Sequence, residues 1–391
     1  MMNLRHPLSL AILFALGSSA FADAPKSSVT PQEQLEAIRA ESKAATAAYY
    51  KEANALPDTL EGSKKSNELF KAYDKGQAAG FLAAVELAQA NSDSDLGLEA
   101  LEWMLTTPRS YYLPAGKIAM ELATEKYAAH PKIGKLIATL GWVPPYEGVD
   151  SRTAALALLN TVAKKNPDRT AQGQAEISLA YQSFGHFSIA EYKKAPDLEK
   201  LAGDAEKAYE KVLDEYGDCY LLRGDEKKTL GALAKQFLFS LRHLRVGKVA
   251  PDIEAVDLDG AKFKLSDSND KIRLVVFWAS WCGPCMAMVP QEREIVARMK
   301  DRPFALIGVN GDEDRAKGNE VAAKNKMGWR SFWNGSKTAT STLAQDWNVT
   351  GWPMVYVLDD RGVIRFKDLH RDELDKAVDE LVDELEKKAK K

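Results

Sequence analysis

Apolar residues recur at helical spacing from about Ser27 to Arg245. In the segment 204–213 they occupy positions i, i+3, i+4, i+7 and i+8, which places them on one face of a helix. The same spacing begins again at Ala155 and, over a longer run, at Leu230. Proline and glycine separate these runs, so the sequence predicts helices joined by short breaks and packed as antiparallel pairs. The breaks fall at 57–58, 144–145, 166–168 and 196–197.

The portion from Asn166 to Gly217 resembles a degenerate tetratricopeptide-type helix pair, with small residues where two helices would pack closely. The consensus is not met cleanly and no strict period runs through the region. Such helices can form a concave face that binds a partner, and the alternative is a helical spacer or cap. We favour the spacer, because nothing in the surface residues selects a ligand.

Near Val246 the pattern changes to short β-like runs that alternate with helices. Gly247, Ala250 and Pro251 mark the boundary. The predicted strands cover 253–256, 263–265, 272–278, 304–309, 354–358 and 363–366, and the predicted helices 284–300, 314–326, 341–346 and 372–388. This order indicates an α/β layer fold with a central mixed sheet that a hairpin completes. We therefore expect two domains, an all-α helical domain at 23–245 and an α/β domain at 246–391; a chain of 391 residues is too long for one core.

The first 22 residues have the features of a secretory signal peptide. A weakly basic start at Arg5 precedes an apolar core at 8–16, and 20–22 fit a small-x-small cleavage site before Asp23. The apolar core is well short of the roughly 20 residues that a spanning helix needs. We expect a cleaved signal peptide and an exported, periplasmic or extracytoplasmic protein, with an uncleaved membrane anchor as the alternative.

Composition and charge exclude one class of partner. The chain is 45% hydrophobic and 28% charged, with a formal net charge of −3. Binding a phosphate backbone needs a basic face, so we expect no nucleic acid. The lysines at 387–391 fit the last turn of a helix, where the dipole favours cations.

The chain has three cysteines, and two of them, Cys282 and Cys285, lie in the stretch FWASWCGPC. Structural disulfides of exported proteins join well-separated residues, and this pair is too close to close a useful loop. A structural zinc site needs about four ligands. No second CxxC exists and the five histidines show no metal spacing, so we expect no metal.

The spacing places Cys282 where a buried strand ends and a helix begins. Pro284 suits the first helical turn, whose N–H groups have no partner in the helix. Those free N–H groups and the dipole favour an anionic sulfur. An unperturbed thiol, with a pKa of about 8.5, is about 3% thiolate at neutral pH; lowering the pKa to about 7, worth roughly 2 kcal/mol, makes it half thiolate. We expect Cys282 to attack a substrate disulfide and the more buried Cys285, one turn further on, to resolve the mixed disulfide.

The motif WCGPC at 281–285 resembles the active site of thioredoxin, and its surroundings are similar to the exported TlpA-like thiol-disulfide oxidoreductases. The segment 246–260 resembles the opening hairpin of that branch, which peroxiredoxins share. Pro290 matches the proline that kinks the active-site helix. The stretch 312–329 occupies the place of the branch's extra helix, and the resemblance covers about 245–391.

Gly351-Trp352-Pro353 matches the family's Gly-x-Pro, whose proline is cis and faces the disulfide. A cis peptide there would leave the backbone of Trp352 able to pair with a substrate chain. Trp352 is bulkier than the residues common at this place, and it would either contact substrate or shield the disulfide. The resemblance implies a thioredoxin fold, a redox-active disulfide between Cys282 and Cys285, no cofactor, and substrate binding at Trp281, Gly283, Pro284, Trp352 and Pro353.

Two departures concern the proton acceptor for Cys285. Thioredoxins place a buried Asp on the strand before the motif, where this chain has Val276. Some exported relatives place a Glu three residues after the second Cys, where this chain has Met288. Solvent, or a carboxylate such as Asp312 or Glu313, would have to serve instead, which puts the rate and the redox poise in doubt.

The Gly-Pro dipeptide resembles the reducing members of the family. It implies net reduction of disulfides in exported proteins, with apocytochrome c among the candidate substrates and a membrane electron donor as second partner. One alternative is a thiol peroxidase, although the Pro-x-x-x-Thr-x-x-Cys setting of peroxiredoxins is absent. Another is a helical scaffold or binding protein with a secondary redox domain. The third cysteine, Cys219, fits a buried small apolar residue, with intermolecular pairing as the alternative.

Overall fold

The computed structural model describes residues 29–57, 59–92, 94–141, 143, 151–223, 227–335, 342–369 and 371–390. The predicted signal peptide at 1–22 and the break at 144–145 lie outside the described residues. Within them, helices alone occupy the chain as far as His243, and the strands follow from Glu254 onwards. None of the described helices is long and apolar enough to span a membrane.

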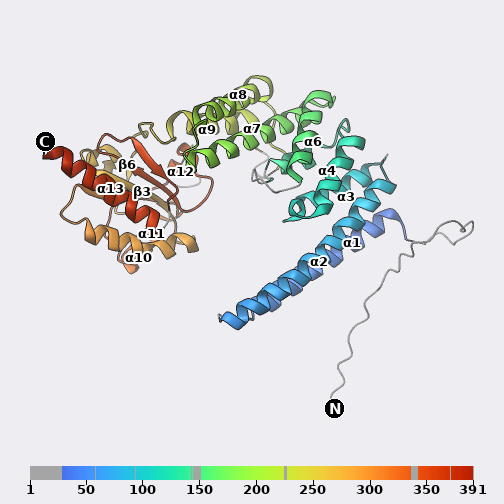
Figure 1. Cartoon of the computed structure of the whole chain (residues 1–391), viewed down its shortest axis with the longest axis horizontal. Coiled ribbons are helices and arrows are strands. Elements are labelled where there is room, and N and C mark those ends of the chain that lie inside the picture. The colour runs from blue at the N-terminus through green and yellow to red at the C-terminus, as the bar shows by residue number, and fades with distance from the viewer. Residues whose placement is uncertain are drawn as a thin grey trace, which may run out of the picture.

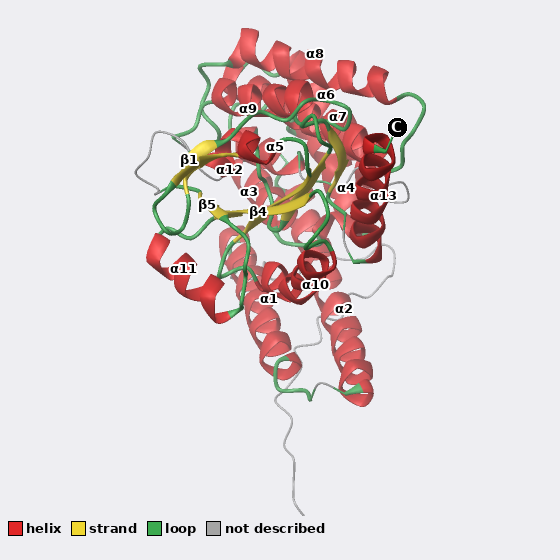
Figure 2. Cartoon of the chain, turned by 90° about the vertical axis from the view of Figure 1, so that its left-hand side faces the viewer, coloured by secondary structure: helices red, strands yellow, loops and turns green. Residues whose placement is uncertain are grey.

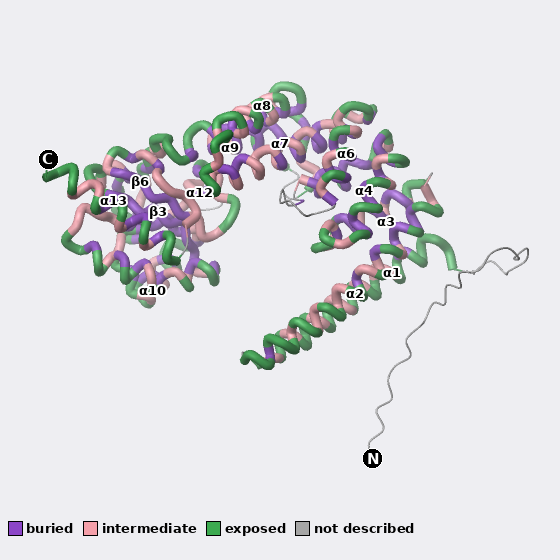
Figure 3. Tube along the Cα trace, viewed as in Figure 1, coloured by how far each residue is buried: buried purple, intermediate pink, exposed green. Residues whose placement is uncertain are grey.

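The helical region begins with a long hairpin of two helices and continues as a curved row of shorter ones (Figure 1). A capping box between Thr30 and Glu33, with Pro31 in the first turn, starts the first helix. Most of the hairpin away from the row is exposed or half-buried (Figure 3). The helices are α1 (Pro31–Ala53), α2 (Leu60–Ala90), α3 (Asp95–Thr106), α4 (Pro114–Lys126), α5 (Gly134–Leu140), α6 (Ser151–Lys165), α7 (Arg169–Tyr192), α8 (Leu198–Tyr216) and α9 (Leu230–His243), with a 3-10 turn at Ser110–Tyr112.

The three segments with helical spacing, at 155–163, 204–213 and 230–241, form α6, α8 and α9. Every apolar position of the longest run, in α9, is buried. Two glycines pack closely where α8 ends and α9 begins, because a Cβ at Gly231 would lie 2.7 Å from the carbonyl oxygen of Gly217. The helical character predicted for this region is therefore confirmed.

The strands of the C-terminal region form a mixed sheet in the order β5-β4-β3-β6-β7. Strand β3 lies at the centre, parallel to β4 and antiparallel to β6. The predicted central mixed sheet is confirmed, and β3 and β6 have the predicted bounds. The strands are β1 (Glu254–Val256), β2 (Lys262–Lys264), β3 (Ile272–Trp278), β4 (Phe304–Asn310), β5 (Ser331–Trp333), β6 (Met354–Leu358) and β7 (Ile364–Lys367), of which β1 and β2 pair as a separate hairpin.

Helices and the β1–β2 hairpin cover the two faces of the sheet (Figure 2). One face, which carries Leu274 and Val276, packs against α10 and α13. The other, which carries Val275 and Phe277, packs against β2 and α12. Every residue of β3 is buried, and because successive side chains point to opposite faces, this strand contributes to the hydrophobic core on each side of the sheet. The helices are α10 (Gly283–Arg298), α11 (Arg315–Lys324), α12 (Leu343–Asp346) and α13 (Asp372–Ala389).

A buried carboxylate joins the helical region to the sheet. Glu191, in α7, accepts a hydrogen bond from the Val246 N–H at 2.9 Å. Its other oxygen lies 3.9 Å from the Lys367 ammonium on β7, and the two side chains are only 7% and 14% exposed. Lys194 also lies over the Phe366 ring. The end of α7 is therefore tied both to the connecting segment and to the edge of the sheet.

We predict that Glu191→Ala lowers the free energy of unfolding by about 2–4 kcal/mol, because the Val246 N–H loses its acceptor and the largely buried Lys367 ammonium loses its carboxylate. Urea unfolding measures the loss. Glu210→Ala is the matched control, since it removes an exposed partner of Arg242 on α8 and should cost less than about 1 kcal/mol. If both variants lose the same free energy of unfolding, the Glu191 contacts stabilise the protein no more than an exposed ion pair does.

Candidate active site around a disulfide

Strand β3 delivers the chain to the start of α10, and Cys282 is the residue at which the helix begins. Its Sγ accepts a hydrogen bond from the Cys285 N–H at 3.1 Å, as an N-cap side chain does. Gly283 and Pro284 form the exposed first turn. Cys282 thus lies at a helix N-terminus, as its sequence position predicts.

The sulfurs of Cys282 and Cys285 are joined in a disulfide. Cys285 is the more buried of the two, with exposed fractions of 2% and 5%. The sequence predicted that order, although Cys282 is also largely covered. Because the pair is closed, opening it requires attack by an incoming thiolate on one of these sulfurs.

Two tryptophans lie beside the disulfide. Trp281 is 62% exposed, and its ring meets the half-buried Trp352 edge to face at 5.6 Å. The Trp352–Pro353 peptide is cis, as the resemblance implied. Trp352 also packs on the backbone of Gly311, where a Cβ would collide with its indole. The structure therefore brings the Gly-x-Pro loop next to the disulfide loop through an aromatic contact.

Asp312 holds the segment that leads into the motif. Its carboxylate accepts hydrogen bonds from the Ser280 N–H at 3.0 Å and from the Ser280 hydroxyl at 2.6 Å. The Asn310 amide donates a third, at 2.7 Å. Asp312 is buried, so these three donors satisfy much of its hydrogen-bonding capacity. Sequence reasoning named it as a candidate proton acceptor, and the structure shows it as an anchor of Ser280.

A carboxyl that sequence reasoning missed is buried in the same core. Glu292 lies in α10 and is 3% exposed. Burial raises its pKa to about 8. The helical period itself could have revealed this residue, because Cys285, Val289, Glu292 and Ile295 fall on one face of the helix.

The remaining cysteine is remote from this site in sequence and in structure. Cys219 is a free thiol buried in the core formed by α7, α8 and α9. Burial raises its pKa, more than the nearby Arg169 lowers it. These surroundings agree with the interpretation of Cys219 as a small buried apolar residue.

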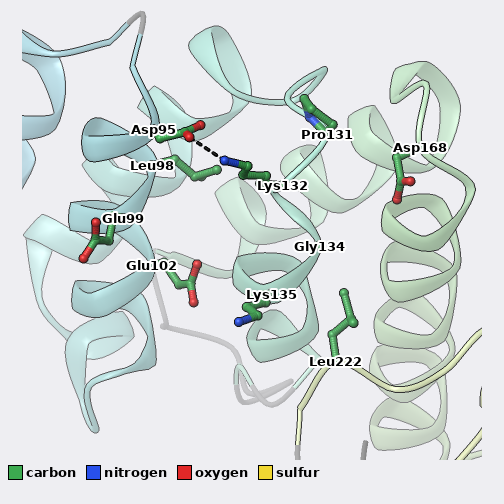
Figure 4. A pocket seen from close by; sticks show the side chains of 10 residues that line it. All are labelled: Asp95, Leu98, Glu99, Glu102, Pro131, Lys132, Gly134, Lys135, Asp168 and Leu222. Carbon is green, nitrogen blue, oxygen red and sulfur yellow. Dashed lines mark hydrogen bonds and ion pairs between the residues drawn. The ribbon is translucent and has the colours of Figure 1, made fainter.

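A cleft of about 520 Å³ opens in the helical region between α3, α5 and the start of α7 (Figure 4). Asp95 pairs with Lys132 across it, and Glu99 pairs with Arg39. Its lining contains no residue of the sheet region. Across the described part of the chain, no group of three or more His, Cys, Asp or Glu side chains is placed to hold a metal ion.

The family model described as Redoxin matches residues 245–385. The chain is 31% identical over 93 residues to thiol-disulfide oxidoreductase ResA of Bacillus cereus, covering 24% of this chain and 51% of that protein. It is 30% identical over 133 residues to thioredoxin-like protein YneN of Bacillus subtilis, covering 32% of this chain and 72% of that protein. The matched part of the chain thus spans about half the length of ResA and nearly three quarters of the length of YneN.

Among solved structures, the thioredoxin domain of a thiol-disulfide oxidoreductase from Bacteroides vulgatus is 28% identical. The superposition covers 35% of this chain and 97% of that domain, with a TM-score of 0.33.

The contact between Trp352 and Gly311 gives a direct test of the site geometry. In Gly311→Ala the added methyl group would displace the Trp352 indole. We therefore expect the tryptophan fluorescence spectrum of the variant to differ from that of the wild type. Gly328→Ala is the control, because a Cβ there meets nothing within 4 Å. Identical spectra for the wild type and Gly311→Ala would contradict the described packing.

Proposed function

This chain belongs to the thioredoxin superfamily, and we propose that it is an exported thiol-disulfide oxidoreductase that reduces disulfides in proteins. The observation that carries the proposal is the Cys282–Cys285 disulfide at the start of α10. Residues 246–391 form the domain that carries this chemistry, and 23–245 form the helical domain.

The reaction is a dithiol–disulfide exchange. In the reduced protein the Cys282 thiolate attacks one sulfur of the substrate disulfide, and the other substrate sulfur leaves as a thiolate. The Cys285 thiolate then attacks Cys282 Sγ, which restores the internal disulfide and releases the second substrate thiol. The Cys285 N–H that now points at Cys282 Sγ would stabilise the thiolate in the first step, because a helix N-terminus favours negative charge.

Substrate would approach over the exposed side of this site. Trp281, Gly283 and Pro284 present their surfaces there, and Trp352 and Pro353 flank them half-buried. Two tryptophan rings supply a large, rigid apolar surface with little loss of side-chain entropy on binding. They favour unfolded or extended polypeptide in which apolar residues flank the disulfide.

The cellular setting follows from the proposal and from the first 22 residues. Cleavage before Asp23 would release the protein outside the cytoplasm, where disulfides form in proteins. Net reduction there needs a membrane electron donor to open the Cys282–Cys285 disulfide after each turnover. Apocytochrome c is one candidate substrate, because its cysteine thiols must be reduced before haem can be attached to them.

We predict that Cys285→Ser accumulates mixed disulfides through Cys282, because the resolving attack is lost while the first attack remains. Non-reducing electrophoresis followed by mass spectrometry detects them and identifies the partners. Cys219→Ser, introduced in the same background, should leave the adducts unchanged. Trapping by Cys282→Ser in place of Cys285→Ser would reverse the two roles, and absence of adducts in both would remove the proposed function.

The aromatic surface gives a second prediction. Trp281→Ala should raise KM for a reducible unfolded protein by about tenfold, since one exposed aromatic contact is worth roughly 1–1.5 kcal/mol. The rate with a small disulfide should change by less than about twofold. Trp329→Phe, which changes a tryptophan outside the motif, is the control. Equal effects on both substrates would assign Trp281 to the disulfide chemistry and not to substrate recognition.

A further inference from the structure

Four sulfur atoms are carried by the short segment 282–288 at the start of α10. Two belong to Cys282 and Cys285, and two belong to Met286 and Met288. The proposed exchange reaction uses the cysteines and neither methionine. Both methionines are half-buried, and they pack against the apolar core that contains Cys282 and Cys285. The two thioethers therefore lie beside the disulfide with part of their surface open to solvent.

Helical geometry distinguishes the two methionines. Met286 lies four residues after Cys282, and its N–H donates to the Cys282 carbonyl at 3.1 Å. Residues four apart are neighbours on a helix, with Cβ atoms about 5–6 Å apart. Side chains lean toward the helix N-terminus, so the Met286 thioether extends back toward the turn that carries both cysteines. Met288 is six residues from Cys282, about 9 Å along the axis, and of the two cysteines it neighbours only Cys285.

Reduction of the disulfide turns this turn of helix into a set of soft ligands. The Cα atoms of Cys282 and Cys285 lie 5.3 Å apart, so both sulfurs can reach one metal ion. Thiolates and thioethers are the ligands that select monovalent copper, and the helix N-terminus favours the thiolate form that binds a metal. A structural zinc site takes about four ligands, more than the two cysteines and Met286 supply.

We propose that the reduced protein binds one Cu(I) ion through the thiolates of Cys282 and Cys285, with the Met286 thioether as the third ligand. The two thiols release their protons when the ion binds. No electron is transferred, so the copper stays monovalent and the cysteines stay reduced. The inference goes beyond the proposed function and relies on it only for the reduced cysteine pair.

The site is accessible from solution through the first turn of the helix, where Gly283 and Pro284 are exposed. A bound ion occupies both sulfurs of the cysteine pair. The copper-loaded protein therefore cannot attack a disulfide until the ion leaves, and an oxidised protein cannot bind the ion until its disulfide is opened. Copper binding and disulfide exchange are mutually exclusive uses of the same two side chains.

The test is competition for Cu(I) with the chelator bathocuproine disulfonate, under nitrogen and with ascorbate to keep the copper monovalent. The full chain carries Cys219→Ala, which removes the third thiol, and it is reduced and then freed of reductant. The reduced protein should bind one copper ion per chain, and the oxidised protein should bind none. Met286→Leu conserves volume and should lower the Cu(I) affinity by about tenfold or more, because even residues that only support metal ligands contribute about 10–100-fold.

Met288→Leu is the matched control, since it makes the same substitution two residues further along the helix and should leave the affinity unchanged. X-ray absorption at the copper edge should detect three sulfur ligands in the wild type and in Met288→Leu, and two in Met286→Leu. Unchanged affinity and three sulfurs in Met286→Leu would overturn the inference, as would a loss that occurs in Met288→Leu instead. Those outcomes would leave the trapping of mixed disulfides by Cys285→Ser intact, whereas normal copper binding without any trapped adduct would remove only the proposed function.

Discussion

The site depends on one hydrogen bond at the point where strand meets helix, from the Cys285 N–H to Cys282 Sγ. The first N–H groups of a helix need acceptors, and here the acceptor is the sulfur of Cys282, the proposed nucleophile. The same bond caps the start of α10, while the disulfide joins the two sulfurs across that first turn. Structure and chemistry therefore cannot be altered separately at this residue.

Two neighbouring contacts keep that junction in place. Asp312, just beyond the end of β4, accepts three hydrogen bonds and so holds Ser280. Trp352 packs on the Gly311 backbone and reaches Trp281. Both contacts arise from the ends of strands that neighbour β3 in the sheet. The sheet order is what gathers residues 280, 311 and 352 from distant parts of the chain, as is usual at the edge where parallel strands end.

The sequence predicted those elements whose hydrophobic pattern lies within the element itself. The apolar run at 272–278 predicted β3 with its observed bounds, and the helical spacing at 230–241 predicted the buried face of α9. The sequence did not predict features that form only through pairing with a distant segment. Strand β5 has only three residues and exists because Ser331 and its neighbours pair with the end of β4. The part played by Asp312 was equally hidden, because its hydrogen-bond donor Ser280 lies 32 residues away.

Glu292 is an intermediate case, because the helical period places it on the buried face of α10 but does not say what it contacts there. The usual carboxylates are replaced by Val276 and Met288, which leaves the core around Cys285 apolar. Burial in such a core disfavours the charged forms of thiols and carboxyls alike. Among the buried residues described for α10, Glu292 is the one that carries a carboxyl. Burial raises the pKa of that carboxyl to about 8, because desolvation in this core disfavours its charged form.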